Sequence, residues 1–172
     1  MTDFLDIGYL KKGSAVQQLA YSDITGNNVL NILQLYTPVL AGTIPVDIAI
    51  PTSDLDILCC FTSAEVFYNY LEQNFGTEQN FKISISCIND EQSVIANFNT
   101  DNFNYEVFGQ AVPVTSQNGY RHMIAEYKIL LKKGESFRNE IIALKQSGYK
   151  TEPAFAKLLG LSGNPYKELL LY

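Results

Sequence analysis

The sequence has few cysteines, no long apolar run and no signal-like N-terminus. Its three cysteines, two of them adjacent at Cys59 and Cys60, are too few for a disulfide framework and lack the paired spacing of a cysteine zinc site. No stretch reaches the roughly 18–20 uninterrupted apolar residues that span a bilayer. The N-terminus lacks a basic start followed by an apolar core. We therefore expect a soluble, cytoplasmic protein that does not associate with a membrane.

Positive charge is also scarce. The 172 residues include 12 Lys and Arg against 18 Asp and Glu, which gives a net charge of −6. A protein that binds nucleic acid over an extended surface needs clustered basic side chains, so we expect no extended nucleic-acid-binding surface. Residues 1–119 carry thirteen acidic and three basic side chains, and residues 120–172 carry five and nine. This asymmetry fits a metal facing the first part and phosphates facing the second, or simply ordinary lysines on helix surfaces.

Apolar residues, at 47% of the chain, are abundant enough for one domain with a sizeable core. Helical spacing predicts helices within residues 14–36, broken near 26–28, and again at 63–76, with Ser63 as the N-cap. Strand-like segments occupy residues 38–41, 54–61, 81–88, 92–100 and 103–110, and turn-like residues at 89–91 and 100–102 indicate that the last three form an antiparallel meander.

The last third of the chain has helical periodicity. We expect helices at 117–134, with Ser116 as a candidate cap and Gly134 as the stop, and at 136–148, 152–160 and 164–172. The layout predicts an α+β fold: a mixed β-sheet of about five strands with flanking helices, followed by a helical C-terminal third. We place the α/β core at residues 1–115 and a helical extension packed on it at 116–172.

Two aspartates open the apolar segment that begins "DLDIL". Side chains two residues apart on a strand point to the same face, so Asp54 and Asp56 project together with their Cα atoms about 6.5–7 Å apart. Two such carboxylates repel each other unless a cation lies between them. The pair therefore favours Mg²⁺ or Mn²⁺, which oxygen ligands bind well.

A third acid, Glu106, lies in the later segment "FNYEVFGQ", among aromatic and β-branched residues that place it on a strand. Three carboxylates from two neighbouring strands suffice to hold two cations about 3.5–4 Å apart, the clamp used for in-line phosphoryl displacement. Whether the strands are neighbours is the spatial assumption behind this prediction.

These residues resemble those of a known superfamily. Gly42-Thr43 about ten residues before Asp54-Leu55-Asp56, together with a third acid on a later strand, is similar to the nucleotidyltransferase superfamily that includes DNA polymerase beta. The segments "GTIP", "SDLDI", "EVFGQ", "QNGYRHM" and "KTEPAFA" also resemble the bacterial family named domain of unknown function 4269, over nearly the whole chain.

The superfamily resemblance implies a role for each matching residue. Asp54, Asp56 and Glu106 would be the catalytic metal ligands, with Glu106 on the cation that activates the attacking hydroxyl. Gly42 would let the backbone approach a nucleoside triphosphate, and Thr43 and Ser53 would contact its phosphates. The reaction would transfer a nucleoside monophosphate to an unidentified acceptor and release pyrophosphate.

The sequence departs from the superfamily pattern at two of these positions. Threonine at residue 43 replaces the usual serine, and glutamate at residue 106 replaces the usual aspartate. Two alternatives therefore stay open. One is a degenerate nucleotide- or metal-binding module that acts through a partner protein, and the other is a cation-dependent phosphohydrolase that uses the same clamp on water.

Helix spacing in residues 117–134 suggests further contacts. Arg121 and Lys128 lie on one polar stripe and are candidates for nucleotide phosphates, although solvated helix faces often look alike. The single histidine, His122, lies four residues before Glu126, which predicts a helical His–Glu pair; a hydrogen-bonded structural role fits it better than acid catalysis. Glu152, before Pro153, is best explained by a helix start.

Overall fold

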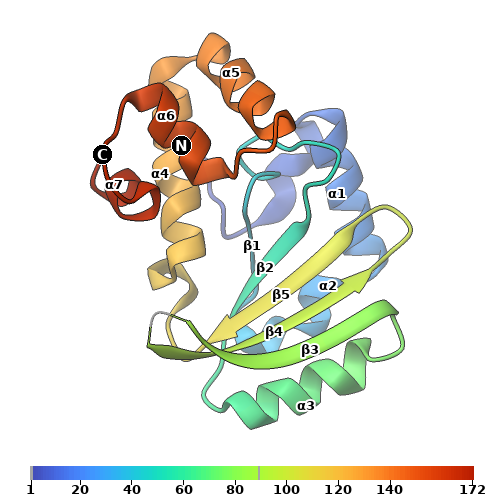
Figure 1. The fold of residues 1–172 in the computed structure, drawn as a ribbon. Helices are drawn as coiled ribbons and strands as arrows, with labels where there is room; N and C mark the ends of the chain where they lie inside the picture. Colours follow the sequence, from blue (N-terminus) through green and yellow to red (C-terminus); the bar gives the residue numbers. More distant parts are fainter. Residues whose placement is uncertain (1, 89) are drawn as a thin grey trace.

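A five-stranded mixed β-sheet forms the centre of the molecule (Figure 1). The computed structural model describes residues 2–88 and 90–172. The strands lie in the order β1-β2-β5-β4-β3. The pair β2–β5 is parallel and the other neighbours are antiparallel. The strands are β1 (Val39–Ala41), β2 (Leu55–Cys60), β3 (Gln79–Ile88), β4 (Glu91–Asn99) and β5 (Asn104–Gln110).

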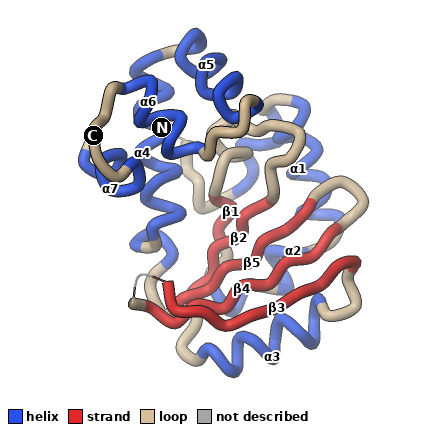
Figure 2. The backbone as a smooth tube through the Cα atoms, viewed as in Figure 1, coloured by secondary structure: helices blue, strands red, loops and turns tan. Residues whose placement is uncertain are grey.

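Helices cover the sheet, and the last third of the chain is helical, so the predicted α+β class is confirmed (Figure 2). The helices of the first part are η1 (Ile7–Lys12), α1 (Ala15–Gly26), α2 (Val29–Ile32), η2 (Gln34–Tyr36) and α3 (Ala64–Phe75). Those of the last part are η3 (Val114–Ser116), α4 (Asn118–Lys133), α5 (Glu135–Gln146), α6 (Thr151–Leu159) and α7 (Pro165–Leu171). None of these described helices is both long and apolar enough to cross a membrane.

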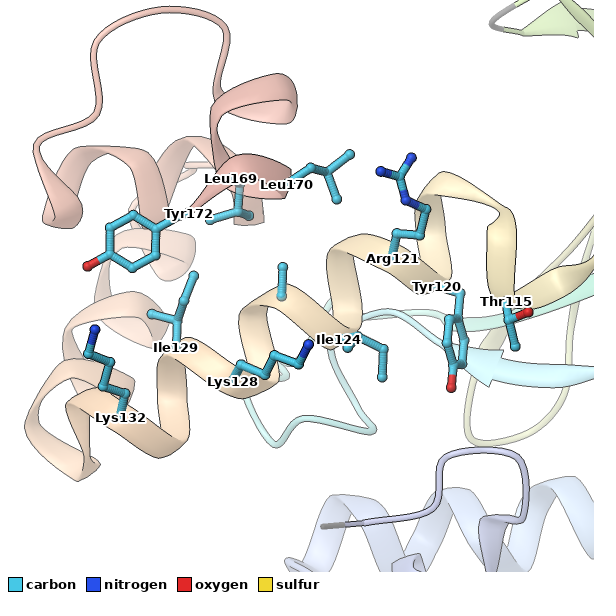
Figure 3. Close-up of a pocket in the computed structure, with 11 residues that line it drawn as sticks. Thr115, Tyr120, Arg121, Ile124, Lys128, Ile129, Lys132, Leu169, Leu170 and Tyr172 are labelled. Carbon is cyan, nitrogen blue, oxygen red and sulfur yellow. The ribbon is translucent and has the colours of Figure 1, made fainter.

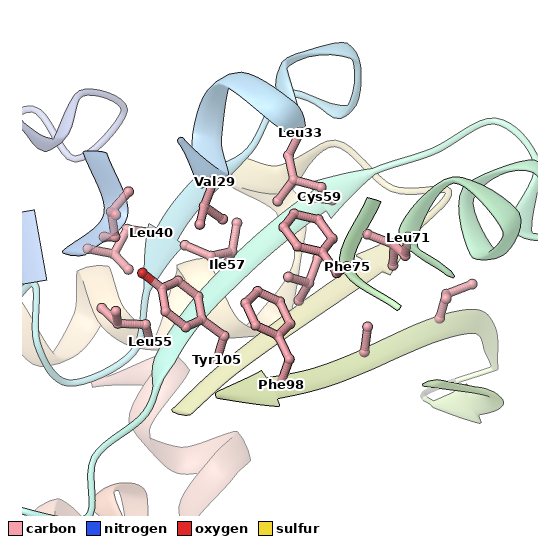
Figure 4. Packing of buried hydrophobic residues seen from close by; sticks show 14 of the residues in the cluster. Val29, Leu33, Leu40, Leu55, Ile57, Cys59, Leu71, Phe75, Phe98 and Tyr105 are labelled. Carbon is pink, nitrogen blue, oxygen red and sulfur yellow. The ribbon is translucent and has the colours of Figure 1, made fainter. Parts of the chain in front are cut away.

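One face of the sheet packs against α1, α2 and α3. The period of two along β2 directs Leu55, Ile57 and Cys59 into this core, where all three are buried (Figure 4). Phe98 and Tyr105, from the neighbouring strands β4 and β5, stack with their ring centroids 4.9 Å apart. The hydroxyl of Tyr105 donates to Asp23 on α1 at 2.7 Å, so a buried carboxylate ties this helix to the sheet.

The opposite face of β2 carries Asp56 and Leu58. Leu58 belongs to a second buried cluster, which is formed with β1 and the C-terminal helices and includes Met123, Ile141 and Phe155. This side of the sheet is therefore closed by α4 to α7. Leu58 is the next residue of β2 on the face that carries Asp56, and α4 and α6 pack against it. These two helices therefore form one wall of the space in front of the Asp56 carboxylate.

Several predicted boundaries are shifted by tertiary contacts. Ser116 does not cap α4, which begins at Asn118 after Gln117. The buried Gln117 instead donates from Nε2 to the carbonyl oxygens of Cys59 and Val112, which fixes the start of the helix against β2. Strand β2 begins at Leu55, so Asp54 lies directly before it.

Other predicted features agree with the structure. Ser63 caps α3 by accepting from the N–H of Val66, and Gly134 ends α4. The helical segment at 14–36 is interrupted after Gly26, as expected. The turn predicted at 89–91 includes Asn89, which lies outside the described residues.

Candidate active site

Two of the three predicted carboxylates lie side by side on the sheet. Asp56 on β2 is the register partner of Glu106 on the parallel strand β5. Neighbouring strands are about 4.7–4.9 Å apart, so paired residues present their side chains on the same face at the same level. Both side chains are half-buried. The structure therefore brings Asp56 and Glu106 together on neighbouring strands, which the prediction of a metal site had assumed.

Asp54 completes the acidic group from the more open end. It is exposed, and its Oδ1 accepts a hydrogen bond from Nδ2 of Asn104 at 3.4 Å. Asn104 and Asp54 each lie two residues before one of the paired acids, Asn104 at the start of β5 and Asp54 directly before β2. The charges of Asp54 and Glu106 both act on Asp56, so we refer to the three residues as the acidic cluster. One ligand atom from each of the three does not lie within 4.8 Å of both others.

The electrostatics of the cluster show how crowded its negative charge is. Burial raises the pKa of Asp56 from 3.8 to about 7, and the charges of Glu106 and Asp54 add to this effect. Burial, and then the charge of Asp54, also raise the pKa of Glu106. Among the described residues the one ion pair within 4.0 Å joins Arg138 to Glu135, so no basic side chain neutralises the cluster by direct contact.

The Asp56–Glu106 pair fits a hard divalent cation. Both residues offer carboxylate oxygens from adjacent strands, and these suit Mg²⁺ or Mn²⁺ better than softer metals. A cation between them would relieve the charge repulsion that, after burial, raises their pKa values. Asp54 is the exposed member of the cluster.

Gly42 brings backbone against the acidic cluster. It follows β1, whose Ala41 is the register partner of Asp56. Its φ of +77° is in the left-handed region that favours glycine. A Cβ atom placed on Gly42 would overlap Oδ2 of Asp56. Both the backbone conformation and the close approach therefore require glycine here.

Thr43 and Ser53, which were both predicted to contact phosphates, lie at the two ends of one loop and are hydrogen-bonded to each other. Oγ1 of Thr43 donates to Oγ of Ser53 at 3.1 Å, and the same Ser53 oxygen accepts from the N–H of Ile50 at 3.0 Å. These bonds close residues 43–53 into a tight loop beside Gly42. The two hydroxyls are therefore hydrogen-bonded to each other, and Thr43 but not Ser53 lines the cavity described below.

Side chains from distant helices anchor this loop. Arg138 on α5 donates to the carbonyl oxygens of Val46 and Asp47, and Lys145 donates from Nζ to the carbonyl of Ile48 at 2.7 Å. Asp47, in the same loop, accepts from Oγ of Ser14 at 2.6 Å and has a left-handed φ of 59°. It is a loop-forming residue.

Lys145, which the sequence did not single out, lies near the acidic residues of the site. It is only 6% exposed. Burial lowers the pKa of Lys145 from 10.5 to about 8, against the opposing charges of Glu126, Asp56 and Glu152. The buried amine of Lys145 therefore balances part of the charge of these three carboxylates, although it forms no ion pair with them within 4.0 Å.

A cavity of about 360 Å³ lies in front of the carboxylates. Gly42, Thr43, Asp56 and Glu106 line it on the sheet side. This volume is at the small end of the range for ligand pockets. The cavity therefore brings Gly42 and Thr43 together with Asp56 and Glu106, whereas the predicted residues Asp54 and Ser53 do not line it.

The helical side of the same cavity carries three residues to which the sequence assigned other roles. His122 and Glu126 project from α4, and Glu152 from the first turn of α6. The helix start predicted at Glu152 is correct, yet the side chain also reaches the cavity. The four-residue spacing of the His–Glu pair was the available signal, whereas nothing in the sequence indicated that a helix thirty residues later would join it.

Arg121 and Lys128 line a different space. They lie along a groove of about 380 Å³ between α4 and α7, together with Lys132 and Tyr172 (Figure 3). Arg121 donates from a guanidinium nitrogen to Oδ1 of Asn118 at 3.2 Å, and Asn118 lines the cavity. Arg121 is thus next to the cavity rim, and Lys128 is two helical turns beyond it.

A family model described as a domain of unknown function, DUF4269, matches residues 22–172. The chain belongs to the DUF4269 family. No curated protein sequence matches it significantly.

Several solved structures share the fold. A crystal structure of Cid1 poly(U) polymerase with Mg 3′-dATP bound superposes with a TM-score of 0.55 at 11% identity, over 77% of this chain and 41% of that one. The polymerase core of TRAMP, an RNA surveillance complex, gives 0.55 at 12% identity over 91% and 49%. The GLD-2/RNP-8 complex gives 0.52 at 12% identity over 91% and 57%. This DUF4269 chain has a nucleotidyltransferase-like fold and spans about half the length of these proteins.

Proposed function

We propose that this DUF4269 protein is a magnesium-dependent nucleotidyltransferase that moves a nucleoside monophosphate from a nucleoside triphosphate to an acceptor. The observation that carries the proposal is the register pairing of Asp56 with Glu106 in front of a cavity whose rim is Gly42. The shared fold and the magnesium–nucleotide complex of Cid1 support it. A cytoplasmic location is part of the proposal, since a reducing compartment keeps the exposed thiol of Cys87 free.

The residues divide the work of the reaction between them. Asp54 and Asp56 would hold both cations and, through them, the nucleotide phosphates, and Glu106 would hold the cation that activates the attacking hydroxyl. When bound, Mg²⁺ would neutralise charge on the phosphates and lower the pKa of that hydroxyl. The backbone at Gly42 would approach the triphosphate, and the Thr43 and Ser53 hydroxyls, which are hydrogen-bonded to each other, would contact its phosphate oxygens.

The chemistry is a single displacement at phosphorus. An acceptor oxygen attacks the α-phosphorus, the bond from that phosphorus to the bridging oxygen of the β-phosphate breaks, and pyrophosphate leaves. The proton of an acceptor hydroxyl passes to solvent.

Labelled nucleotides test the proposal. The chain is incubated with each nucleoside triphosphate labelled at the α-phosphate, with Mg²⁺ and with a panel of hydroxyl and phosphate acceptors. Transfer of label to an acceptor with release of pyrophosphate is the expected result. Release of inorganic phosphate alone would identify the phosphohydrolase instead, and binding without turnover would identify the degenerate module.

Matched variants assign the activity to the site. Asp54→Asn and Asp56→Asn are expected to abolish magnesium-dependent binding of nucleoside triphosphate and the transfer reaction. The control is Asp101→Asn, which removes an exposed carboxylate from the turn between β4 and β5. Nucleotide affinity that is equal in all three variants and in the wild type would refute the proposed site.

A further inference from the structure

The helical wall of the cavity holds three potential metal ligands that the proposed transfer reaction does not use. His122 and Glu126 lie four residues apart on α4, so their side chains point the same way. Glu152 reaches them from α6. One ligand atom from each residue lies within 4.8 Å of the others. Three donors from two helices therefore converge on a point at the cavity surface.

The histidine in this group lacks the partner that a buried histidine needs. His122 is only 7% exposed, and its Nδ1 has no hydrogen-bond partner in the described part of the chain. Leaving a buried polar atom unpaired costs about 1–3 kcal/mol, so such atoms are rare in folded proteins. The hydrogen-bonded structural role that the sequence favoured is therefore not met at this nitrogen. A bound ion would satisfy it.

The two carboxylates also lack a close ion pair. Glu126 is only 3% exposed. Neither glutamate has a basic group within 4.0 Å among residues 2–88 and 90–172, where the one such pair is Arg138–Glu135. Lys145 acts on both through its charge, and its amine donates to the carbonyl of Ile48.

We propose that His122, Glu126 and Glu152 bind a divalent transition-metal ion, with Zn²⁺ as the ion of choice, at a site distinct from the carboxylates of the sheet. One imidazole and two carboxylates suit Zn²⁺, which binds nitrogen and oxygen ligands at about 2.0–2.2 Å, whereas Mg²⁺ rarely takes a nitrogen ligand. The ligand atoms converge in the unbound state and need to close by a few ångström at most to reach these distances.

Three protein ligands leave one position of a tetrahedral ion open. Because all three residues line the cavity, this position faces the same space as Asp56 and Glu106. A water molecule or an oxygen of a bound substrate would complete the coordination. The inference stands on the helical residues alone and does not require the proposed nucleotidyl transfer.

The unique histidine makes a direct test possible. The sequence contains one His, so in a tag-free, ¹⁵N-labelled chain the imidazole nitrogen signals belong to His122 without assignment. The chain is stripped of metal with a chelator and titrated with Zn²⁺ alone. We expect saturable binding by calorimetry, with a large shift of one ring nitrogen in step with it. Ring signals that stay unchanged at saturating Zn²⁺ would overturn the proposal.

Variants then locate the ion. His122→Gln and Glu126→Gln should each weaken Zn²⁺ binding by more than about 100-fold, since even changes behind a metal ligand cost about 10–100-fold. Glu140→Gln on the exposed face of α5 is the matched control and should bind as the wild type does. Circular dichroism establishes that each variant is folded. If a variant does not fold, the wild-type nitrogen shift still decides.

Asp54→Asn separates this site from the proposed magnesium site. It should lose magnesium-dependent nucleotide binding and keep its affinity for Zn²⁺. Equal loss of Zn²⁺ affinity in Asp54→Asn would place the ion among the sheet carboxylates and overturn the assignment to the helices. Zinc affinity in the wild type weaker than about 1 mM, or unaffected by His122→Gln, would do the same.

Discussion

Gly42 and Asp56 are packed so closely that a side chain at residue 42 would displace the carboxylate of residue 56. The two residues lie at the neighbouring ends of β1 and β2, and their contact sets the position of the acid that is also paired with Glu106. A methyl group added at residue 42 would therefore contact Asp56 and change the geometry of the acidic cluster.

We predict that Gly42→Ala loses activity far beyond its loss of stability. The left-handed backbone costs a residue with a Cβ about 1–2 kcal/mol, and a misplacement of about 1 Å at a catalytic group can cost roughly 100-fold in rate. Transfer activity and urea unfolding are measured on the same preparations. We expect activity to fall at least 100-fold, with the protein still folded.

Gly160→Ala is the control for that prediction. Gly160 is in the left-handed conformation, with φ of 68° and ψ of 29°, and a Cβ there meets no atom within 4 Å. The variant should have a left-handed backbone cost and keep its activity. Equal activity losses in Gly42→Ala and Gly160→Ala would show that backbone strain, rather than contact with Asp56, explains the effect.

The stability of the metal-free protein should depend on pH through Asp56. Burial and the charges of Glu106 and Asp54 raise the pKa of this carboxyl from 3.8 to about 7, so the folded state binds its proton more tightly than the unfolded state does. Below about pH 4 both states are protonated and the group has no effect. As pH rises from 4 to 7 the folded state must lose this favoured proton, and its stability falls.

Asp56→Asn isolates this contribution. In a chelator, the variant should be more stable than the wild type by about 1–3 kcal/mol at pH 8, and the difference should vanish near pH 4. Saturating Mg²⁺ should then stabilise the wild type and leave the variant unchanged. Urea unfolding across the pH range provides the measurement. A difference in stability that is the same at pH 4 and pH 8 would contradict the assigned cause.

Lys145→Met should loosen the loop that frames the cavity. The substitution removes the donor to the carbonyl of Ile48 and the cation nearest to the buried acids. Loss of a hydrogen bond to a charged donor costs about 1.5–3 kcal/mol. We expect destabilisation of this size and faster amide hydrogen exchange in residues 43–50.

The comparison variant is Lys150→Met, which removes an exposed lysine next to α6. Surface changes of this kind cost about 0.5 kcal/mol or less. Unchanged hydrogen exchange in the loop of Lys145→Met would mean that Arg138 and the bonds within the loop are sufficient to hold it.

The sheet side of the site was predictable because strand periodicity is local. A run of apolar residues after Asp54 indicates a buried strand, and the period of two puts Asp56 on the face opposite Ile57. The sequence does not specify which strand lies beside β2. That the last strand of the meander pairs with it in parallel, and brings Glu106 level with Asp56, results from the order of the whole sheet.

The helical side was not predictable because its residues have ordinary local roles. Glu152 does occupy a helix start, and lysines in the last third of the chain looked like a solvated surface. Packing of α5 and α6 over the sheet turns Glu152 into the cavity and buries Lys145. These contacts join β2 to helices that follow it by more than forty residues in the sequence. The residue pattern of a single segment does not predict such contacts.

Arg121 and Lys128 provide the last test of the nucleotide assignments. Both line the groove between α4 and α7, so they can meet a nucleotide only where it extends past Asn118 and out of the cavity. Arg121 is at that rim and Lys128 is two turns farther along the helix. We therefore expect Arg121→Ala to raise the KM for nucleoside triphosphate several-fold and Lys128→Ala to raise it less, with kcat preserved in both. Lys133→Ala, at the exposed end of α4, is the control. The reverse order of KM values would place the phosphates in the groove between the two helices.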